Sequence, residues 1–133
     1  MKATEKYIIT VKNVQSAGDM RDRVTESGRG TYRQKNGVSY ITYKTADASV
    51  MIRAEKGRVS IKRTGDATSE VNYIPGKLSE FEYRTQYGSI CMSVLTETVE
   101  ADAQNGVIRL KYILQTGGDE IKNDITITIR EDK

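Results

Sequence analysis

An arginine at the end of an apolar stripe has the clearest chemical potential in this sequence. Val59, Ile61 and Arg63 alternate with polar neighbours, so they share one face of a predicted strand. That face points to the interior, where a guanidinium is costly unless it is paired and hydrogen-bonded. Its planar fork of donors suits a carboxylate or a phosphate, so Arg63 is a candidate ligand-binding residue.

Two carboxylates are candidate partners for this guanidinium. Glu26 shares its parity with apolar neighbours on its own predicted strand, so it is expected inside or at a rim. Glu100 is the second candidate. A bulge at Gly28 or Gly30 would shift the parity and separate Glu26 from Arg63. A structural ion pair, or a rim residue that reaches water, is the alternative to ligand binding.

Hydroxyl-bearing side chains are predicted to line the same interior. They share parity with apolar residues of their strands: Tyr83, Thr85, Tyr87, Thr96, Thr98 and Tyr112, with Phe81 and Asn123 beside them. Apolar walls with a few polar groups are typical of small-molecule sites. The alternative is a filled core in which these hydroxyls satisfy one another and the backbone.

The chain contains no histidine and one cysteine. Zinc sites of the usual Cys/His type and Ser-His-Asp or Cys-His catalytic sets are therefore excluded. Cys91 is expected to be a reduced, partly buried thiol. No catalytic set stands out among the remaining residues, so we expect a protein that is not an enzyme and needs no cofactor.

Basic residues are concentrated in the first half of the chain. Residues 1–66 hold 14 Lys and Arg against 7 Asp and Glu, whereas residues 67–133 hold 7 against 11. Segment 20–35 places its cations on one parity: Arg21, Arg23, Arg29, Arg33 and Lys35. Nucleic-acid binding is disfavoured there, because carboxylates interleave and Tyr32 has the opposite parity, which leaves no stacking platform. A protein-interaction module or a homodimer that uses this basic face is a further alternative.

Period-two alternation and turn residues recur along the whole chain. Segment 121–130 places its isoleucines on one face and polar residues on the other, as a half-buried strand requires. Asn36-Gly37 and Asn105-Gly106 are typical of tight hairpin turns. We therefore predict one all-β domain over residues 1–133, a small antiparallel up-and-down barrel of about eight to ten strands.

Segment 81–100 is either one long strand or two strands that meet at Gly88. Residues 83–99 would span about 55 Å if straight, at about 3.3 Å per residue. Because a small domain is nearer ~30 Å across, the segment must bend, and Gly88 permits the bend. Strong bending of this kind is typical of a closed barrel.

Two short motifs carry a resemblance to a known family. IKRTG at 61–65 and YRTQYG at 83–88, followed by Thr96, resemble the YwiB-like bacterial family of unknown function. The similarity runs from about Gly30 to the C-terminus. It implies a lipocalin-like, calycin-type β-barrel and no established activity.

These observations together lead to one functional expectation. The sequence predicts non-catalytic binding of a small, partly apolar molecule with an anionic end near Arg63. No signal-peptide core and no membrane-spanning run is visible, so a cytoplasmic protein without a membrane partner is expected.

Overall fold

The computed structural model describes residues 6–132, which form an almost continuous series of β-strands. The strands are β1 (Tyr7–Ala17), β2 (Met20–Lys35), β3 (Val38–Lys44), β4 (Ala48–Glu55), β5 (Arg58–Gly65), β6 (Ala67–Tyr73), β7 (Leu78–Thr85), β8 (Gly88–Asp102), β9 (Val107–Thr116) and β10 (Asp119–Glu131). A short 3-10 helix, η1 (Ala103–Asn105), connects β8 to β9. Short turns join the other strands, as the glycine pairs in the sequence predict.

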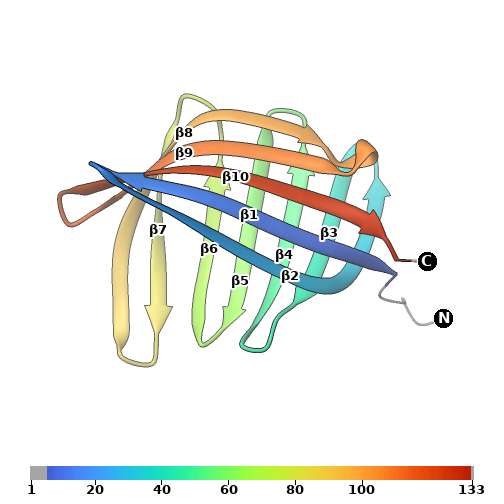
Figure 1. Ribbon diagram of the computed structural model, residues 1–133, viewed down its shortest axis with the longest axis horizontal. Coiled ribbons are helices and arrows are strands. Elements are labelled where there is room, and N and C mark those ends of the chain that lie inside the picture. The colour runs from blue at the N-terminus through green and yellow to red at the C-terminus, as the bar shows by residue number, and fades with distance from the viewer. Residues whose placement is uncertain (1–5, 133) are drawn as a thin grey trace.

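The ten strands close into a barrel. Each strand pairs antiparallel with the next, and β1 pairs with both β2 and β10 (Figure 1). Closure gives every strand a neighbour on both sides and removes the exposed edges that an open sheet would leave. The predicted all-β, up-and-down, lipocalin-like architecture is confirmed, with a strand number at the top of the predicted range.

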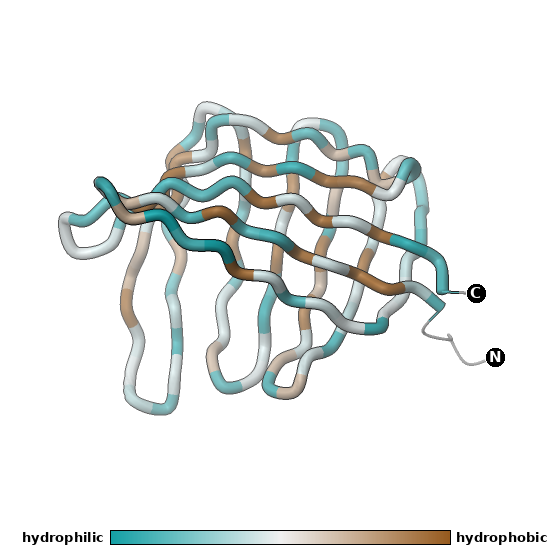
Figure 2. The backbone as a smooth tube through the Cα atoms, viewed as in Figure 1, coloured by the Kyte–Doolittle hydropathy of each residue, from teal (hydrophilic) through white to brown (hydrophobic). Residues whose placement is uncertain are grey.

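Alternation along the strands sorts side chains between the inside and the outside of the barrel. On β10, Ile125 and Ile127 are buried, whereas Asp124 and Thr128 are exposed. The same alternation is visible along most strands as brown and teal segments in Figure 2. Burial of these aliphatic side chains supplies the main favourable term in folding, at roughly 25 cal/mol per Å² of apolar surface.

The two ends of the barrel differ. The turns β1–β2 and β9–β10 extend to the left in Figure 1, whereas the turns β3–β4, β5–β6 and β7–β8 extend downward. Because successive turns of an up-and-down barrel alternate between its ends, these five turns belong to one end, which we call the open end. The opposite end, with the turns β2–β3, β4–β5, β6–β7 and β8–β9, is called the filled end.

Two glycines allow β2 to pack tightly against β3. A Cβ on Gly30 would overlap the carbonyl oxygen of Thr42, and one on Gly28 would overlap that of Lys44. The pairing of β2 with β1 runs through both glycines without a register shift, and its pairing with β3 begins at Gly30. The bulge that would have moved Glu26 to the outside is therefore absent, and close backbone approach explains the glycines instead.

The segment that was predicted as one or two strands is a hairpin followed by an irregular strand. β7 and β8 meet at a turn before Gly88, whose φ of 130° is accessible to glycine. A register shift between Thr96 and Thr98 then reverses the parity of β8, so Thr98 and Glu100 are exposed. Their predicted inward orientation is wrong for this reason. Cys91 is also exposed rather than partly buried, because it lies on the outward parity before the shift.

Candidate functional site

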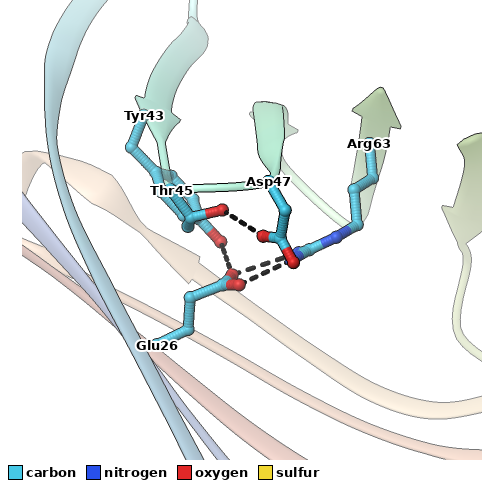
Figure 3. A network of polar contacts seen from close by, with 5 residues as sticks. All are labelled: Glu26, Tyr43, Thr45, Asp47 and Arg63. Carbon is cyan, nitrogen blue, oxygen red and sulfur yellow. Dashed lines mark hydrogen bonds and ion pairs between the residues drawn. The ribbon is translucent and has the colours of Figure 1, made fainter. Parts of the chain in front are cut away.

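The arginine singled out in the sequence is paired with the predicted carboxylate at the open end of the barrel. Arg63 on β5 donates from Nη2 to Glu26 Oε1 at 2.6 Å and from Nη1 to Glu26 Oε2 at 3.1 Å. Glu26 lies on β2, three strands away around the barrel, so the pair spans the enclosed space (Figure 3). The two side chains are 35% and 25% exposed, which places the pair at a rim between core and solvent.

Three neighbouring residues complete the polar network. The hydroxyl of Tyr43, on β3, donates to Glu26 Oε2 at 2.7 Å. The turn after β3 supplies Asp47, whose Oδ1 accepts a hydrogen bond from Thr45 Oγ1 at 3.0 Å. In Figure 3 the Asp47 carboxylate lies beside the Arg63 guanidinium. The network thus holds two carboxylates and one guanidinium, with a formal charge of about −1.

The network shifts the ionisation of its members in consistent directions. The Arg63 hydrogen bonds lower the pKa of Glu26, against the opposing effect of burial. Hydrogen bonding to Glu26 raises the pKa of Arg63, and the nearby charge of Asp47 contributes to this increase. Burial, followed by the bond to Glu26, raises the pKa of Tyr43. At neutral pH the site therefore holds an ion pair and a neutral phenol.

Apolar side chains on the inner face of the open end remain accessible to solvent. Val24 on β2 is 48% exposed, and Ile90 on β8 is 55% exposed. Tyr83 is the register partner of Ile90 on β7 and is 36% exposed. Ile9, Val59 and Ile108, on the inner face of the filled end, by contrast have no exposed surface. The open end therefore offers apolar surface next to an ion pair, which is the composition of a small-molecule site.

A hollow of about 690 Å³ lies at the rim of the open end. It is lined by the β5–β6 turn, residues 65–68, and by residues 83–87 at the end of β7 and in the following turn. Arg63 is not one of its lining residues. The hollow has the size of a ligand pocket, but its lining does not include the ion pair.

Comparison with protein-family models assigns the chain to a family. A model described as a domain of unknown function (DUF1934) matches residues 9–129. The chain belongs to the DUF1934 family. The crystal structure of the ywiB protein from Bacillus subtilis is similar, with a TM-score of 0.85 over 96% of this chain and 92% of that chain, at 19% sequence identity. The comparison with curated proteins gave no match.

These matches confirm the YwiB-like resemblance and the barrel fold of this DUF1934 chain. At 19% identity the structural likeness concerns the fold alone. Within residues 6–132, no helix is long and apolar enough to cross a membrane. The same residues contain no cluster of three or more carboxylate or thiol side chains placed to hold a metal ion.

Three of the predicted site residues lie at the rim of the DUF1934 barrel. Tyr83, Thr85 and Tyr87 all line the hollow. Thr85 also organises the β7–β8 turn, because its hydroxyl donates to Gly88 O and accepts from the Tyr87 N–H. Tyr87 is 90% exposed at the tip of this turn. These three residues stay candidates for a rim site, separate from the Arg63–Glu26 pair.

Two further predicted site residues lie in the core. Thr96 and Tyr112 are register partners on β8 and β9, with 1% and 8% exposure. Tyr112 packs against Tyr73 with ring centroids 4.8 Å apart, and burial raises the pKa of both phenols. The structure therefore places this pair in the core, as the alternative to a pocket wall predicted, but the buried Thr96 hydroxyl has no hydrogen-bond partner there.

Sequence reasoning missed two polar features of the open end. The first is the contribution of Tyr43 and Asp47 to the ion pair, which depends on β2, β3 and β5 meeting inside the barrel. The second is an amide cluster in which Asn123 Oδ1 accepts from Asn13 at 3.0 Å and from Gln15 at 3.2 Å. Strand parity already places Asn123 on an apolar stripe, but only the pairing of β1 with β10 reveals its partners.

Proposed function

We propose that this protein binds a small, partly apolar molecule at the open end of the barrel, without catalysis. The ligand places a hydrogen-bond acceptor, such as a carboxylate or carbonyl oxygen, on Arg63. One observation carries the proposal: half-exposed apolar side chains of the inner face lie at the same end of the barrel as an ion pair, while the core at the opposite end is buried. Covering solvent-accessible apolar surface of this kind with a ligand removes it from water, which favours binding.

The hydrogen-bonding capacity of Arg63 defines the polar end of the ligand. A guanidinium has five N–H donors, and Glu26 accepts from two nitrogen atoms of Arg63. The remaining donors are available to an acceptor that approaches from the open end. The negative charge of Asp47 lies close by and opposes negative charge on the ligand, the more so the larger that charge is. The site thus favours one carboxylate or a neutral carbonyl over a doubly charged phosphate.

The apolar part of the ligand contacts the open-end wall. Tyr83 and Ile90 form a cross-strand pair on the inner face of the β7–β8 hairpin. The rim hollow of about 690 Å³ reaches Tyr83 but is not lined by Arg63, so the proposed ligand extends from this hollow to the ion pair. Covering such side chains stabilises a complex by roughly 25 cal/mol per Å² of apolar surface, before the entropy of association is subtracted.

Two related fluorescent probes test this proposal. Anilinonaphthalene sulfonate carries aromatic rings and one anionic group, whereas phenylnaphthylamine has a similar ring system without the charge. Both probes are expected to bind the native protein, and Arg63→Gln is expected to weaken only the sulfonate probe, by about tenfold, since a charge-assisted hydrogen bond contributes about 1.5–3 kcal/mol. Fluorescence titration measures both affinities, and far-ultraviolet circular dichroism verifies that the variant is folded.

The variant Glu26→Gln is the matched control. It leaves Arg63 without its competing carboxylate, so the sulfonate probe is expected to bind more tightly than to the unmodified protein. Equal effects of the two substitutions, or native protein that binds neither probe, would contradict the proposal. Native mass spectrometry of freshly purified protein adds an independent measurement, because it detects a co-purified ligand and also distinguishes a monomer from a homodimer.

A further inference from the structure

The outer face of the barrel over β2 to β5 carries a group of exposed cations that we call the basic wall. Where these strands pair with one another, six cationic side chains point outward: Arg33, Lys35, Lys44, Arg53, Arg58 and Lys62. Along β2 the same face continues with Arg21, Arg23 and Arg29. On these strand segments the same face carries one carboxylate, Glu55. Within residues 6–132, none of the six cations takes part in an ion pair. Two of the cations, Arg58 and Lys62, have the carboxylates Glu55 and Glu70 as register partners, but the basic wall keeps a net positive charge, which attracts anionic partners.

The opposite wall has the reverse character. The exposed carboxylates of β7 and β8 are Glu80, Glu82, Glu97, Glu100 and Asp102. One of the few cations there, Arg84, is already paired with Glu82 at 2.7 Å. The first half of the sequence is basic and the second half is acidic. Because β1 to β5 and β6 to β10 form opposite arcs of the closed sheet, one side of the barrel is basic and the other is acidic.

An aromatic ring lies within the basic wall, between two arginines. Tyr40 on β3 is the register partner of Arg33 on β2 and of Arg53 on β4. The Arg53 guanidinium carbon lies 6.0 Å from the centroid of the Tyr40 ring. Nucleobases stack on aromatic rings and on guanidinium planes alike. This row supplies the stacking platform that was absent from β2 alone, where Tyr32 points inward.

A shallow hollow borders this row. It has a volume of about 260 Å³ and is lined by residues of β3, β4 and β5 that include Lys44, Met51 and Lys62. Met51 is 50% exposed and offers apolar contact, and the two lysines offer ammonium groups for phosphate oxygens. Cations beside aromatic and apolar surface are the combination by which proteins bind single strands without sequence preference.

From this arrangement we propose that the basic wall binds single-stranded nucleic acid. The Arg33–Tyr40–Arg53 row stacks bases, and the surrounding lysines and arginines contact phosphates. A duplex fits less well, because its bases are stacked inside and the convex wall presents no helix or protruding ribbon to a groove. An acidic polypeptide would use the cations but would leave the stacking row unused. The inference concerns the outside of the barrel and is independent of the ligand site at the open end.

Fluorescence polarisation with a labelled oligothymidylate of roughly 20 nucleotides tests the proposal, from about 50 to about 200 mM KCl. Binding is expected to weaken with salt. The variant Arg58→Gln/Lys62→Gln removes two phosphate contacts outside the stacking row, so affinity at the lowest salt is expected to fall about tenfold. The slope of log K against log salt is expected to decrease in magnitude by about 1.4. The variant Tyr40→Leu removes stacking alone and is expected to weaken binding about fivefold or more with an unchanged slope.

The opposite side of the barrel offers a matched control. Arg109→Gln/Lys111→Gln on β9 removes the same two charge types from exposed outward positions and is expected to leave binding almost unchanged. Equal losses in the two double variants, or no binding at the lowest salt, would overturn the proposal. Polyglutamate that competes as well as the oligothymidylate, together with an unaffected Tyr40→Leu variant, would overturn it in favour of an acidic protein partner. Thermal unfolding of each variant verifies that the barrel is intact.

Discussion

The filled end and the open end of the barrel are built from the same strands but differ in how their interiors are packed. At the filled end, Ile9, Val59 and Ile108 have no exposed surface. At the open end, Val24 and Ile90 point to the same interior but remain about half exposed. The hairpins of the open end extend in two directions (Figure 1).

The difference shows that orientation and burial are separate properties of a strand residue. Alternation determines which side chains face inward, because successive Cβ atoms point to opposite faces. Burial depends in addition on how closely the opposing strands approach, which local sequence does not encode. A barrel can therefore combine a stable core at one end with an accessible ligand site at the other, using one continuous pattern.

Truncation of one aliphatic side chain at each end should produce the largest contrast. Leu110→Ala at the filled end is expected to lower the free energy of unfolding by about 2–5 kcal/mol, because it creates a cavity in a fully packed region. Ile90→Ala at the open end should lower it by less than about 1 kcal/mol, since solvent already reaches this side chain. Urea denaturation measures both values. Similar losses would mean that the open end is covered in solution, by a ligand or a second copy of the chain.

The sequence predicts the fold well because the pattern that specifies each strand lies within that strand and its adjoining turns. The alternation in β10 and the Asn-Gly turns specify strands and hairpins locally, and closure pairs the two strands that would otherwise be exposed edges. The register shift between Thr96 and Thr98 is different. It inserts one extra residue without a glycine or proline to mark it, so parity continued past it gave the wrong face for Glu100.

The candidate site is predicted only in part, for a related reason. The parity of β2 and β5 correctly brings Glu26 to Arg63, because both residues follow uninterrupted alternation. The roles of Tyr43 and Asp47 depend on the distance across the barrel, which no single segment determines. The Arg33–Tyr40–Arg53 row likewise depends on strand pairing. Its members come from three strands, so the pattern of β2 alone does not reveal it.

The ion pair at the open end should have an intermediate energetic effect. Arg63→Gln is expected to destabilise the protein by about 1–3 kcal/mol, because it leaves the partly buried carboxylate of Glu26 without its charged partner. The double variant Glu26→Gln/Arg63→Gln should lose less than the sum of the two single variants, since neither charge is then unpaired. A double-mutant cycle from urea denaturation gives the coupling energy. Strict additivity would show that the pair is loosely held in solution.

The smallest effect should be the pH dependence of this same ion pair. Because Arg63 lowers the pKa of Glu26 below its ordinary value of 4.5, the folded state binds this proton more weakly than the unfolded state. The stabilisation is therefore complete above that ordinary value and decreases as the pH falls through the lower pKa of the folded state. Glu26→Gln removes this contribution to stability and should make the loss of stability between about pH 6 and about pH 3 less steep than in the unmodified protein.

Urea denaturation across this range tests the sign of the effect. Ile90→Ala serves as a control, since it removes no titratable group and should retain the slope of the unmodified protein. An unchanged slope in Glu26→Gln would mean that Glu26 titrates alike in both states and that the open end does not hold it against Arg63.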